Sequence, residues 1–294
     1  MAVRIVTDTT ANMPAEDSDK HGIVVVPLSV TLDGVTYVDG VSDEDFFKAL
    51  AASKAFPMSS QPPVTAFTDV FSAAAAAGDE VVGVFISSEM SGTYSTALLA
   101  RDIVRETYSD AVIEIVDSRS NCMEEGFAVL AAAEATEAGA TASEAAEAAR
   151  EMRLRTRFLF VPDTLEYLRR GGRMGNATAL LGTLLQIRPI LTIVDGVTDV
   201  FGKVRTKRKA LTEIVAAFKR DIEEKGLGDV LVHHIVNEDE GRILAAMVEE
   251  IVGHPVRIMP IGPAIGMHVG PGAAALVYHT VRPMNKRPTG GDQA

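Results

Sequence analysis

The hydrophobic residues of the first half of the chain fall into short runs that alternate with helical patterns. Several runs are nearly continuous in valine and isoleucine, which is typical of strands covered on both faces. The stretches between them carry helix-start signals, such as the capping-box pattern Thr141-Ala-Ser-Glu144. This alternation predicts a mainly parallel sheet in an α/β domain. The predicted strands are Val3–Thr7, Ile23–Ser29, Glu80–Ile86, Val112–Asp117 and Phe158–Val161, and the predicted helices are Phe46–Ser53, Thr65–Ala77 and Ala145–Met152.

The second half predicts a different arrangement of strands. Asp195-Gly196 separates two apolar runs, and this dipeptide is a strong signal for a two-residue hairpin turn. We therefore expect two α/β domains, residues 1–162 and 163–282, with a ligand site between them and a loose tail over 283–294. The predicted elements here are the strands Pro189–Val194, Val197–Lys203, Val230–Ile235, Val256–Met259 and Ala273–Tyr278 and the helix Asp239–Val252.

Composition excludes several classes of function. The formal net charge of −12 over 294 residues argues against broad binding to nucleic acid or to an anionic membrane, so at most transient membrane contact is expected. The absence of tryptophan leaves little aromatic surface for base stacking. No secretory leader is predicted, and no apolar run reaches the ~18 residues of a membrane span. The single cysteine, Cys122, fits a reducing cytoplasm, and we expect it to be buried and inert.

Polar segments rich in hydroxyl groups lie at or near the predicted strand ends. Ligands of open α/β sheets bind outside the carboxyl ends of strands, so these segments are candidates for a binding site. Each could instead cap a helix or form a turn, which is the commoner role of such residues. The four segments are Thr7-Asp-Thr-Thr10, Ser59-Ser-Gln-Pro62, Ser87-Ser-Glu-Met-Ser-Gly-Thr93 and Asp117-Ser118.

A histidine, His268, lies in the glycine- and proline-rich segment Ile261–Gly272. Glycine permits close approach and positive φ, and proline fixes φ, so the segment predicts a rigid, apolar turn that holds the imidazole beside a ligand. The alternative is a connector in which the histidine has only a structural role.

The sequence supports catalytic hypotheses less well than a binding site. No Gly-x-Ser-x-Gly elbow is present, although Ser91, Asp117 and His268 leave a hydrolase triad open. His233 and His234 face opposite sides of a predicted strand, which is poor geometry for binding one metal ion together. His234 with Glu238 is a weak candidate for a metal pair at a loop. No phosphate-binding glycine motif appears. The sequence therefore predicts no metal and no cofactor, and favours binding of an anion over its transformation.

Two basic clusters stand out in this acidic chain. The first, Leu165–Gly175, carries Arg169, Arg170 and Arg173 around a Gly-Gly pair, and the second is Lys203-Val-Arg-Thr-Lys-Arg-Lys209. Either could be an ordinary solvated face. Because the rest of the chain is acidic, a second hypothesis is that these positive clusters form a docking surface for a partner.

Five of these motifs, taken in order, resemble the DegV family. They are Thr7-Asp-Thr-Thr10, Ser59-Ser-Gln-Pro62, Ser91-Gly-Thr-Tyr94, Leu165–Arg173 and Ile261–Gly272. The resemblance thus runs from residue 7 to residue 272. The chain departs from the family pattern at Ser59, where threonine is usual, and at Pro63, where serine is common.

The resemblance implies a fatty-acid-binding protein that is itself no enzyme. Some family members carry the acyl group for a bacterial fatty acid kinase, whose separate ATP-dependent subunit phosphorylates the carboxylate. By motif position, Ser59, Ser91 and His268 would contact the carboxylate, with Gly92 and Thr93 beside them. Ser59 keeps the hydroxyl of the usual threonine but loses the methyl group that restricts its rotamer.

The favoured hypothesis is therefore a cytoplasmic carrier with a role in phospholipid metabolism, which presents a long-chain fatty acid to a kinase subunit. Arg170, Arg173 and Arg205 are candidates for docking that partner or neutralising the incoming phosphate. The alternatives are a lipid hydrolase that uses Ser91 and His268, and an acyl-sensing protein without a kinase partner.

Overall fold

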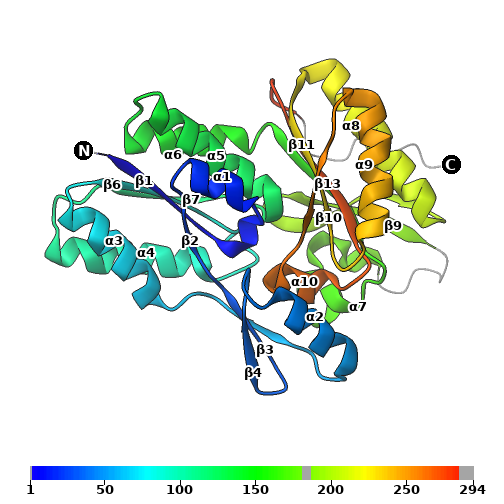
Figure 1. Ribbon diagram of the computed structural model, residues 1–294, viewed down its shortest axis with the longest axis horizontal. Coiled ribbons are helices and arrows are strands. Elements are labelled where there is room, and N and C mark those ends of the chain that lie inside the picture. The colour runs from blue at the N-terminus through cyan, green and yellow to red at the C-terminus, as the bar shows by residue number, and fades with distance from the viewer. Residues whose placement is uncertain (1, 181–186, 285–294) are drawn as a thin grey trace. The chain divides into compact units, whose positions relative to one another are not determined.

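The computed structural model describes residues 2–180 and 187–284, and the chain divides into two compact units (Figure 1). Unit 1 comprises Met1–Arg153 together with Gly262–Ala264, and unit 2 comprises Leu154–Ile261 and Ile265–Ala294. Each has its own sheet and its own hydrophobic core. The predicted class, two α/β domains of which the first has a mainly parallel sheet, is confirmed.

Unit 1 is built on a four-stranded sheet in which every neighbouring pair is parallel, in the order β2-β1-β6-β7. Because parallel strands need crossovers, helices cover both faces. Figure 1 shows α3 and α4 on one face and α5 and α6 on the other. The strands are β1 (Val3–Asp8), β2 (Val24–Val26), β6 (Glu80–Phe85) and β7 (Ile113–Asp117), and the four helices are α3 (Val64–Ala76), α4 (Thr93–Thr107), α5 (Cys122–Glu137) and α6 (Ala142–Met152).

The core on the α3 and α4 side is aromatic. Phe67, Phe71 and Phe85 are fully buried there, and Phe67 meets Phe85 edge-to-face with ring centroids 5.1 Å apart. The helix α6 begins at the predicted capping box: Thr141 accepts a hydrogen bond from the Glu144 N–H, and Glu144 accepts from the Thr141 N–H. Such reciprocal capping satisfies two N–H groups that a helix start otherwise leaves open.

The predicted strand Ile23–Ser29 is wrong as a single element. Its first part is β2 of the parallel sheet, and the chain then enters β3 (Ser29–Leu32) of a separate three-stranded sheet, β4-β3-β5. Pro27 stands at the break, and proline has no N–H to donate to a ladder. The small sheet is antiparallel, with β4 (Val35–Val38) and β5 (Met58–Ser60) on either side of β3. The helices α1 (Ala15–Lys20) and α2 (Asp43–Ala52) and the short 3₁₀ turn η1 (Thr9–Ala11) complete unit 1.

Unit 2 contains a six-stranded mixed sheet in the order β10-β9-β8-β13-β11-β12. All neighbouring pairs are antiparallel except β11 with β12. The predicted hairpin is confirmed at the β9–β10 turn, where Asp195 and Gly196 have φ of 51° and 87°, as a type I′ turn requires. The strands are β8 (Thr156–Val161), β9 (Arg188–Val194), β10 (Val197–Val204), β11 (Leu227–His234), β12 (Arg257–Pro260) and β13 (Ala274–Thr280).

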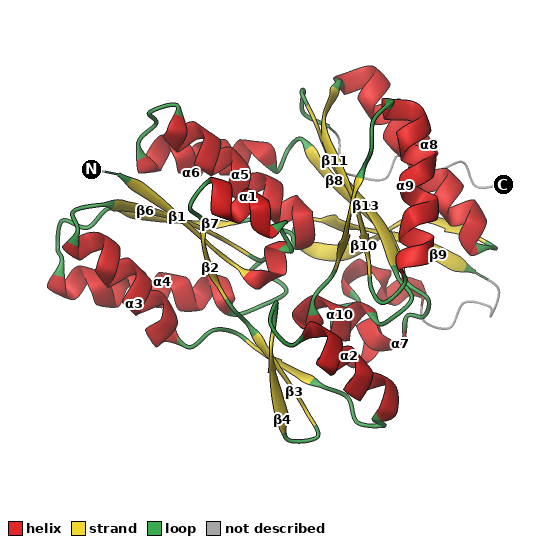
Figure 2. Ribbon diagram, in the orientation of Figure 1, coloured by secondary structure: helices red, strands yellow, loops and turns green. Residues whose placement is uncertain are grey.

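Two long helices supply much of the core of unit 2. The helices α8 (Lys207–Lys225) and α9 (Glu238–Val252) pack Phe218, Leu244 and Val248 against the sheet, where Tyr278 is also fully buried (Figure 2). The Tyr278 hydroxyl donates to Asp221, which also pairs with Arg157 at 2.9 Å. The short elements α7 (Glu166–Arg170), η2 (Gly175–Leu180) and α10 (Pro263–Val269) carry the motifs of the candidate site.

The two units divide at Arg153 and Leu154, ahead of the predicted boundary at residue 162. The reason is β8, which pairs with β9 and β13 and so belongs to the sheet of unit 2. Of the predicted tail, residues 285–294 lie outside the described residues, while the N–H of Met284 donates to the Leu154 carbonyl at 2.8 Å.

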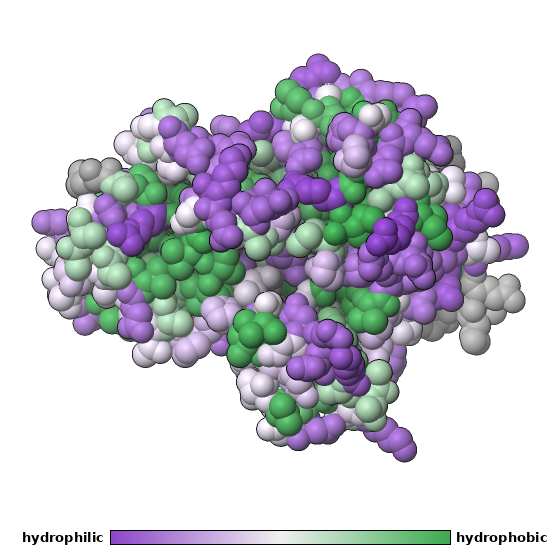
Figure 3. All heavy atoms as spheres, in the orientation of Figure 1, coloured by the Kyte–Doolittle hydropathy of each residue, from purple (hydrophilic) through white to green (hydrophobic). Residues whose placement is uncertain are grey.

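Apolar side chains reach the surface as well as the core in unit 1. Figure 3 shows a hydrophobic patch over α4 and β2, where Leu99 is 54% exposed and Ile103 and Val25 are 40% and 39% exposed. Because α4 also buries Ala97, Ala100 and Val104, apolar residues occupy both of its faces.

Within residues 2–180 and 187–284, no helix combines the length and the apolar character needed to cross a bilayer.

Candidate functional site

Hydroxyl-rich segments meet at the carboxyl end of the parallel sheet in unit 1. Asp8, the last residue of β1, accepts hydrogen bonds from the N–H of Thr10 at 2.8 Å and of Ile86 at 3.2 Å. The Ser87 N–H donates to the Ser120 carbonyl, which joins the segment after β6 to the segment after β7. Three of the four predicted polar segments are therefore brought together where open α/β sheets bind ligands.

Ser91 and Thr93 form the N-terminal turn of α4. The Ser91 Oγ accepts the Thr93 N–H at 3.3 Å and lies 2.9 Å from the Thr93 Oγ1. The helix has 15 residues, and its Gly92 N-cap has no side chain to occupy the first N–H groups. Such a terminus presents N–H donors and the positive end of the helix dipole, which together favour an anion.

The second hydroxyl segment lies against this same helix start. The Gln61 Nε2, two residues after Ser59, donates to the Thr96 Oγ1 one turn into α4. A Cβ at Gly92 would lie 2.0 Å from the Gln61 Oε1, so a larger residue here would displace the Gln61 amide from the helix start. Ser59 is half-buried on β5, where it pairs with Val30 of β3. The structure therefore positions the Ser59 segment and Ser91 within one unit.

His268 lies in unit 2, and its segment is a helix where a turn was predicted. Pro263 opens α10 and Gly270, at φ 88°, closes it, which is the usual proline-first, glycine-last order. The imidazole rests on Gly171, whose added Cβ would lie 2.2 Å from the His268 Nδ1. The motifs Leu165–Arg173 and Ile261–Gly272 thus meet at this ring.

The His268 imidazole is neutral at physiological pH. Burial lowers its pKa from 6.5 to about 4, and the nearby Arg173 charge lowers it further in the same direction. A neutral imidazole has one N–H donor and one acceptor nitrogen, so His268 can donate a hydrogen bond to an anion but adds no charge.

The three candidate arginines occupy different environments in unit 2. The Arg173 Nη1 donates to the Gly171 carbonyl at 2.7 Å, which holds it beside His268. Arg170 is exposed at the end of α7, and Arg205 is exposed in the loop between β10 and α8. Arg169, from the same predicted cluster, pairs with Glu166 at 2.7 Å.

Two residues that the sequence did not single out form hydrogen bonds within unit 1, to the Gly262–Ala264 segment that belongs to this unit. The Asn12 Oδ1 accepts the Gly262 N–H at 2.8 Å, and the Asp39 Oδ1 accepts the Ala264 N–H at 2.9 Å. Burial raises the pKa of Asp39 from 3.8 to about 6 against these hydrogen bonds. The sequence signal for Asp39 was only an aspartate before a glycine, which reads as a turn.

The hydrolase and metal readings gain nothing from these contacts. The Asp117 carboxylate accepts from Ser88, at 2.6 Å from its hydroxyl, and pairs with Arg119, so it is engaged at the end of β7. Cys122 is fully buried, and burial and its acidic neighbours raise the pKa of its thiol well above 9.0. Among the described residues, no group of three or more His, Cys, Asp or Glu side chains could hold a metal ion.

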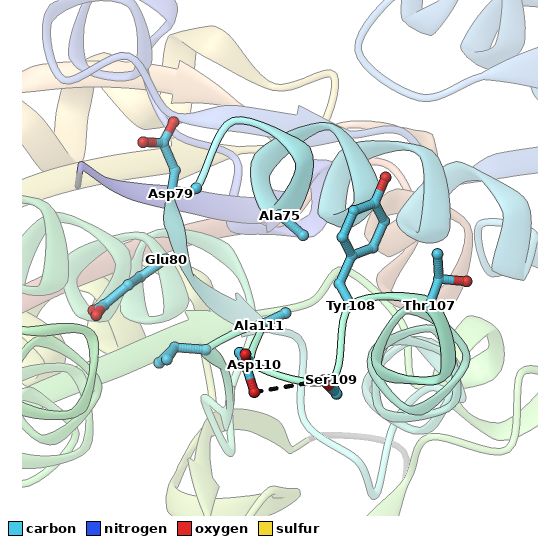
Figure 4. A pocket seen from close by; sticks show the side chains of 10 residues that line it. Ala75, Asp79, Glu80, Thr107, Tyr108, Ser109, Asp110 and Ala111 are labelled. Carbon is cyan, nitrogen blue, oxygen red and sulfur yellow. Dashed lines mark hydrogen bonds between the residues drawn. The ribbon is translucent and has the colours of Figure 1, made fainter.

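A cavity of about 490 Å³ lies at the opposite end of the sheet in unit 1 (Figure 4). It opens beside the first residues of β6 and the C-terminal ends of α3 and α4, and its lining includes Asp110, Asp79, which pairs with Arg4, and Glu80, which accepts the Ala142 N–H. Carboxylates and helix C-termini both repel an anion. This cavity is therefore unsuited to the acidic head group that the α4 terminus favours.

The chain is similar to known proteins over nearly its whole length. The chain matches the model of a family described as uncharacterised proteins of the DegV family over residues 2–281. A DegV domain-containing protein of Clostridium acetobutylicum is 46% identical over 285 residues, which is 97% of this chain and all of the relative.

Solved structures of similar proteins are described as fatty-acid-binding proteins. A fatty-acid-binding DegV family protein of Thermus thermophilus superposes with a TM-score of 0.84 at 31% identity, over 95% of this chain and 100% of that one. DegV of Bacillus subtilis, described as a fatty acid binding protein, gives a TM-score of 0.84 at 30% identity, over 95% of this chain and 99% of that one. A stearic-acid-binding protein of Eubacterium ventriosum gives 0.86 at 28% identity over 96% and 99%.

Proposed function

The chain belongs to the DegV family, and on this premise we propose that it binds a long-chain fatty acid whose carboxylate is held by Ser91 and Thr93 at the start of α4. The observation that carries the proposal is the N-terminus of this helix, where the N-cap is a glycine and the hydroxyl groups of Ser91 and Thr93 lie 2.9 Å apart. Hydrogen bonds to a charged group contribute roughly 1.5–3 kcal/mol each, so a few suffice to orient a carboxylate.

The acyl chain supplies most of the binding free energy in this proposal. Each buried methylene contributes about 0.8 kcal/mol, so a chain of ~14 methylenes gains on the order of 11 kcal/mol before ordering costs. Tyr94 and Leu98 follow Ser91 on α4 and pack against the aromatic core of unit 1. We place the acyl chain in this apolar part of unit 1.

His268 and Ser59 are proposed as further contacts to the carboxylate, on the strength of their motif positions. A neutral imidazole suits this role, because it can donate one hydrogen bond without fixing the anion by charge. Ser59 keeps the hydroxyl that the family threonine would supply. Gln61, two residues after Ser59, donates to the Thr96 hydroxyl one turn into α4, which supports this assignment.

We further propose that the protein presents the carboxylate to a separate ATP-dependent kinase subunit in the cytoplasm and carries no catalytic residue of its own. Arg170, Arg173 and Arg205 are proposed to dock that subunit or to neutralise the phosphate. The support is their exposure or their position beside His268, in a chain whose net charge is −12. Opposite charges at the rim of an interface mainly accelerate association.

The first experiment asks whether the protein carries a fatty acid. Protein purified from bacteria is denatured and extracted, and mass spectrometry should find about one fatty acid per chain, as the proposed single site requires.

Ser91→Ala should then weaken binding of the free acid by about tenfold, as one lost charge-assisted hydrogen bond predicts, and spare the methyl ester. Ser95→Ala, an exposed serine on the same helix, is the matched control. Equal losses for acid and ester would remove Ser91 from the head-group site.

A second experiment separates carrier, hydrolase and sensor. Incubation with a candidate kinase subunit and ATP should yield acyl phosphate, and charge reversal at Arg170 should slow its formation. Hydrolysis of acyl esters without ATP, abolished by Ser91→Ala, would instead favour a lipid hydrolase. Fatty acid binding with no acyl phosphate formed by any such kinase would favour an acyl sensor.

A further inference from the structure

Two fully buried carboxyl groups meet below the start of the proposed site, and the proposed function uses neither. Asp8 ends β1, and Glu125 lies on α5. The hydroxyl of Thr10 stands between them: it makes a short contact to the Asp8 Oδ1 and lies 3.1 Å from the Glu125 Oε2. The other Glu125 oxygen, Oε1, lies 3.3 Å from the Thr7 hydroxyl.

Counting hydrogens assigns the donors in this group. Burial raises the pKa of Asp8 to about 6, so at neutral pH it is ionised and both of its oxygens are acceptors. The Asp8 Oδ1 accepts the Thr10 N–H at 2.8 Å and takes the single hydrogen of the Thr10 hydroxyl as well. The Thr10 oxygen then has only lone pairs to offer. Its contact with the Glu125 Oε2 is a hydrogen bond only when Glu125 supplies the hydrogen.

We propose that Glu125 is a protonated positioning residue at neutral pH, which donates to Thr10 and thereby holds Asp8 where it secures the Ser87–Ser91 segment of the fatty-acid site. This inference rests on the proposed function for its consequence but not for the location of the proton. The charged form of Glu125 would place two carboxylates against one hydroxyl, and the chain Glu125–Thr10–Asp8 would then open.

Burial and the neighbouring carboxylates favour the neutral form of Glu125, and they outweigh the hydroxyl groups of Thr10 and Thr7, which act in the other direction. The titratable groups around the pair are Asp39 ahead of α2, Asp117 at the end of β7, and Cys122 and Glu124 on α5 itself. From α6, the neighbouring helix, the buried residues are four alanines and Met152. Burial, and then the Asp8 charge, raise the pKa of Glu125 well above its usual value of 4.5.

Asp8 is connected to the proposed fatty-acid site through the backbone N–H of Ile86. The Asp8 Oδ2 accepts the Ile86 N–H at 3.2 Å, directly before the Ser87–Ser91 segment. That segment folds back on Ser87, whose carbonyl accepts the N–H of Met90 at 2.9 Å and of Ser91 at 3.1 Å. Asp8 therefore anchors the turn that delivers Ser91 to α4, and Glu125 anchors Asp8.

Infrared spectroscopy tests the proton directly, without a ligand. At neutral pH the wild-type protein should show the carbonyl stretch of a protonated, buried carboxylic acid, and Glu125→Gln should lose it. Glu124→Gln removes the adjacent buried glutamate, which bonds to Ser120, and should keep the band. A wild-type spectrum without the band, or a band that Glu124→Gln removes, would overturn the assignment. Should Glu125→Gln not fold, Thr10→Val should shift the frequency of the band, and an unchanged frequency would count equally against it.

Binding of a fluorescent long-chain fatty acid from neutral to alkaline pH tests the positioning role. Wild-type affinity should fall about tenfold per pH unit once Glu125 ionises, because only the protonated fraction is competent. Glu125→Gln stays neutral, so its affinity should remain level over that range and match wild type at neutral pH. Parallel decline of both proteins would refute the role. A wild-type protein that binds the probe at no pH would refute the proposed function instead and leave the infrared result standing.

Discussion

Gly171→Ala isolates the contribution of the His268 imidazole with one methyl group. Gly171 has φ −76°, an ordinary value for alanine, so the substitution brings no backbone strain. The new Cβ would lie 2.2 Å from the His268 Nδ1 and 3.1 Å from the Tyr167 carbonyl. The Gly171 N–H already donates to that carbonyl at 2.8 Å, so the backbone is held and the imidazole has to move.

The expected loss of affinity follows from one hydrogen bond. Because the proposed function gives His268 a hydrogen bond to the carboxylate, displacing the ring forfeits roughly 1.5–3 kcal/mol. This corresponds to about a ten- to hundredfold weaker fatty acid complex. The backbone conformation at Gly171 suits alanine, so the cost to the folded state is that of moving the buried ring, about 1–3 kcal/mol.

The assay compares fatty acid affinity and unfolding free energy across a small set of variants. His268→Ala should weaken binding to a similar extent, and the double variant should be no weaker than His268→Ala alone, because both changes remove the same contact. Gly172→Ala is the control: it has open space around its Cβ but φ 69°, so it should cost about 1–2 kcal/mol of stability and leave binding intact. Unchanged binding in Gly171→Ala, or additive losses in the double variant, would refute the role of His268.

Three further predictions concern stability. Burial raises the pKa of Asp8 and of Asp39 from 3.8 to about 6, so the stability each contributes is complete below pH 3.8 and lost as pH rises through 6. Between about pH 5 and about pH 7.5, ionisation of each aspartate should lower the unfolding free energy by about 1.4 kcal/mol, and Asp39→Asn should remove the contribution of Asp39. An unfolding free energy that rises with pH over this range, in both the wild type and Asp39→Asn, would contradict this. Asp221→Ala strands the buried Arg157 charge and should cost about 3–5 kcal/mol in chemical denaturation, and a loss below about 1 kcal/mol would show that water reaches Arg157. Thr141→Ala removes a helix cap and should cost about 1 kcal/mol, whereas Thr141→Ser should cost less than half of that.

The parallel sheet of unit 1 could be predicted because each of its strands has a recognisable local sequence pattern. β1, β6 and β7 are runs of valine and isoleucine buried on both faces, and β9 and β10 are joined by a turn dipeptide. Membership of a sheet is different, because it depends on residues far apart in the chain. β8 reads like the strands before it, yet it pairs with β13, more than a hundred residues further on.

The candidate site could be predicted as a set of motifs but not as an arrangement. Ser91 was found from its position after β6, but the helix it opens, α4, was not predicted, since apolar residues lie on both faces of α4. The segment of His268 reads as a turn because of its glycines and prolines, whereas in the structure Pro263–Val269 form a short helix whose His268 ring lies against Gly171. Glu125 gave no signal, because a glutamate in a helix is by default a surface residue.

The chemistry of these groups explains how a binding protein could release its ligand. The proposed contacts to the carboxylate are hydroxyl groups, helix N–H groups and a histidine whose pKa of about 4 keeps it neutral. A bidentate arginine would bind more strongly and would also lower the reactivity of the carboxylate oxygens toward a phosphoryl donor. Arg173 instead donates to the Gly171 carbonyl and acts on His268 through its charge. In the proposed function, the acyl chain therefore supplies the affinity and neutral donors supply the orientation, a division that would leave the carboxylate available to the proposed partner.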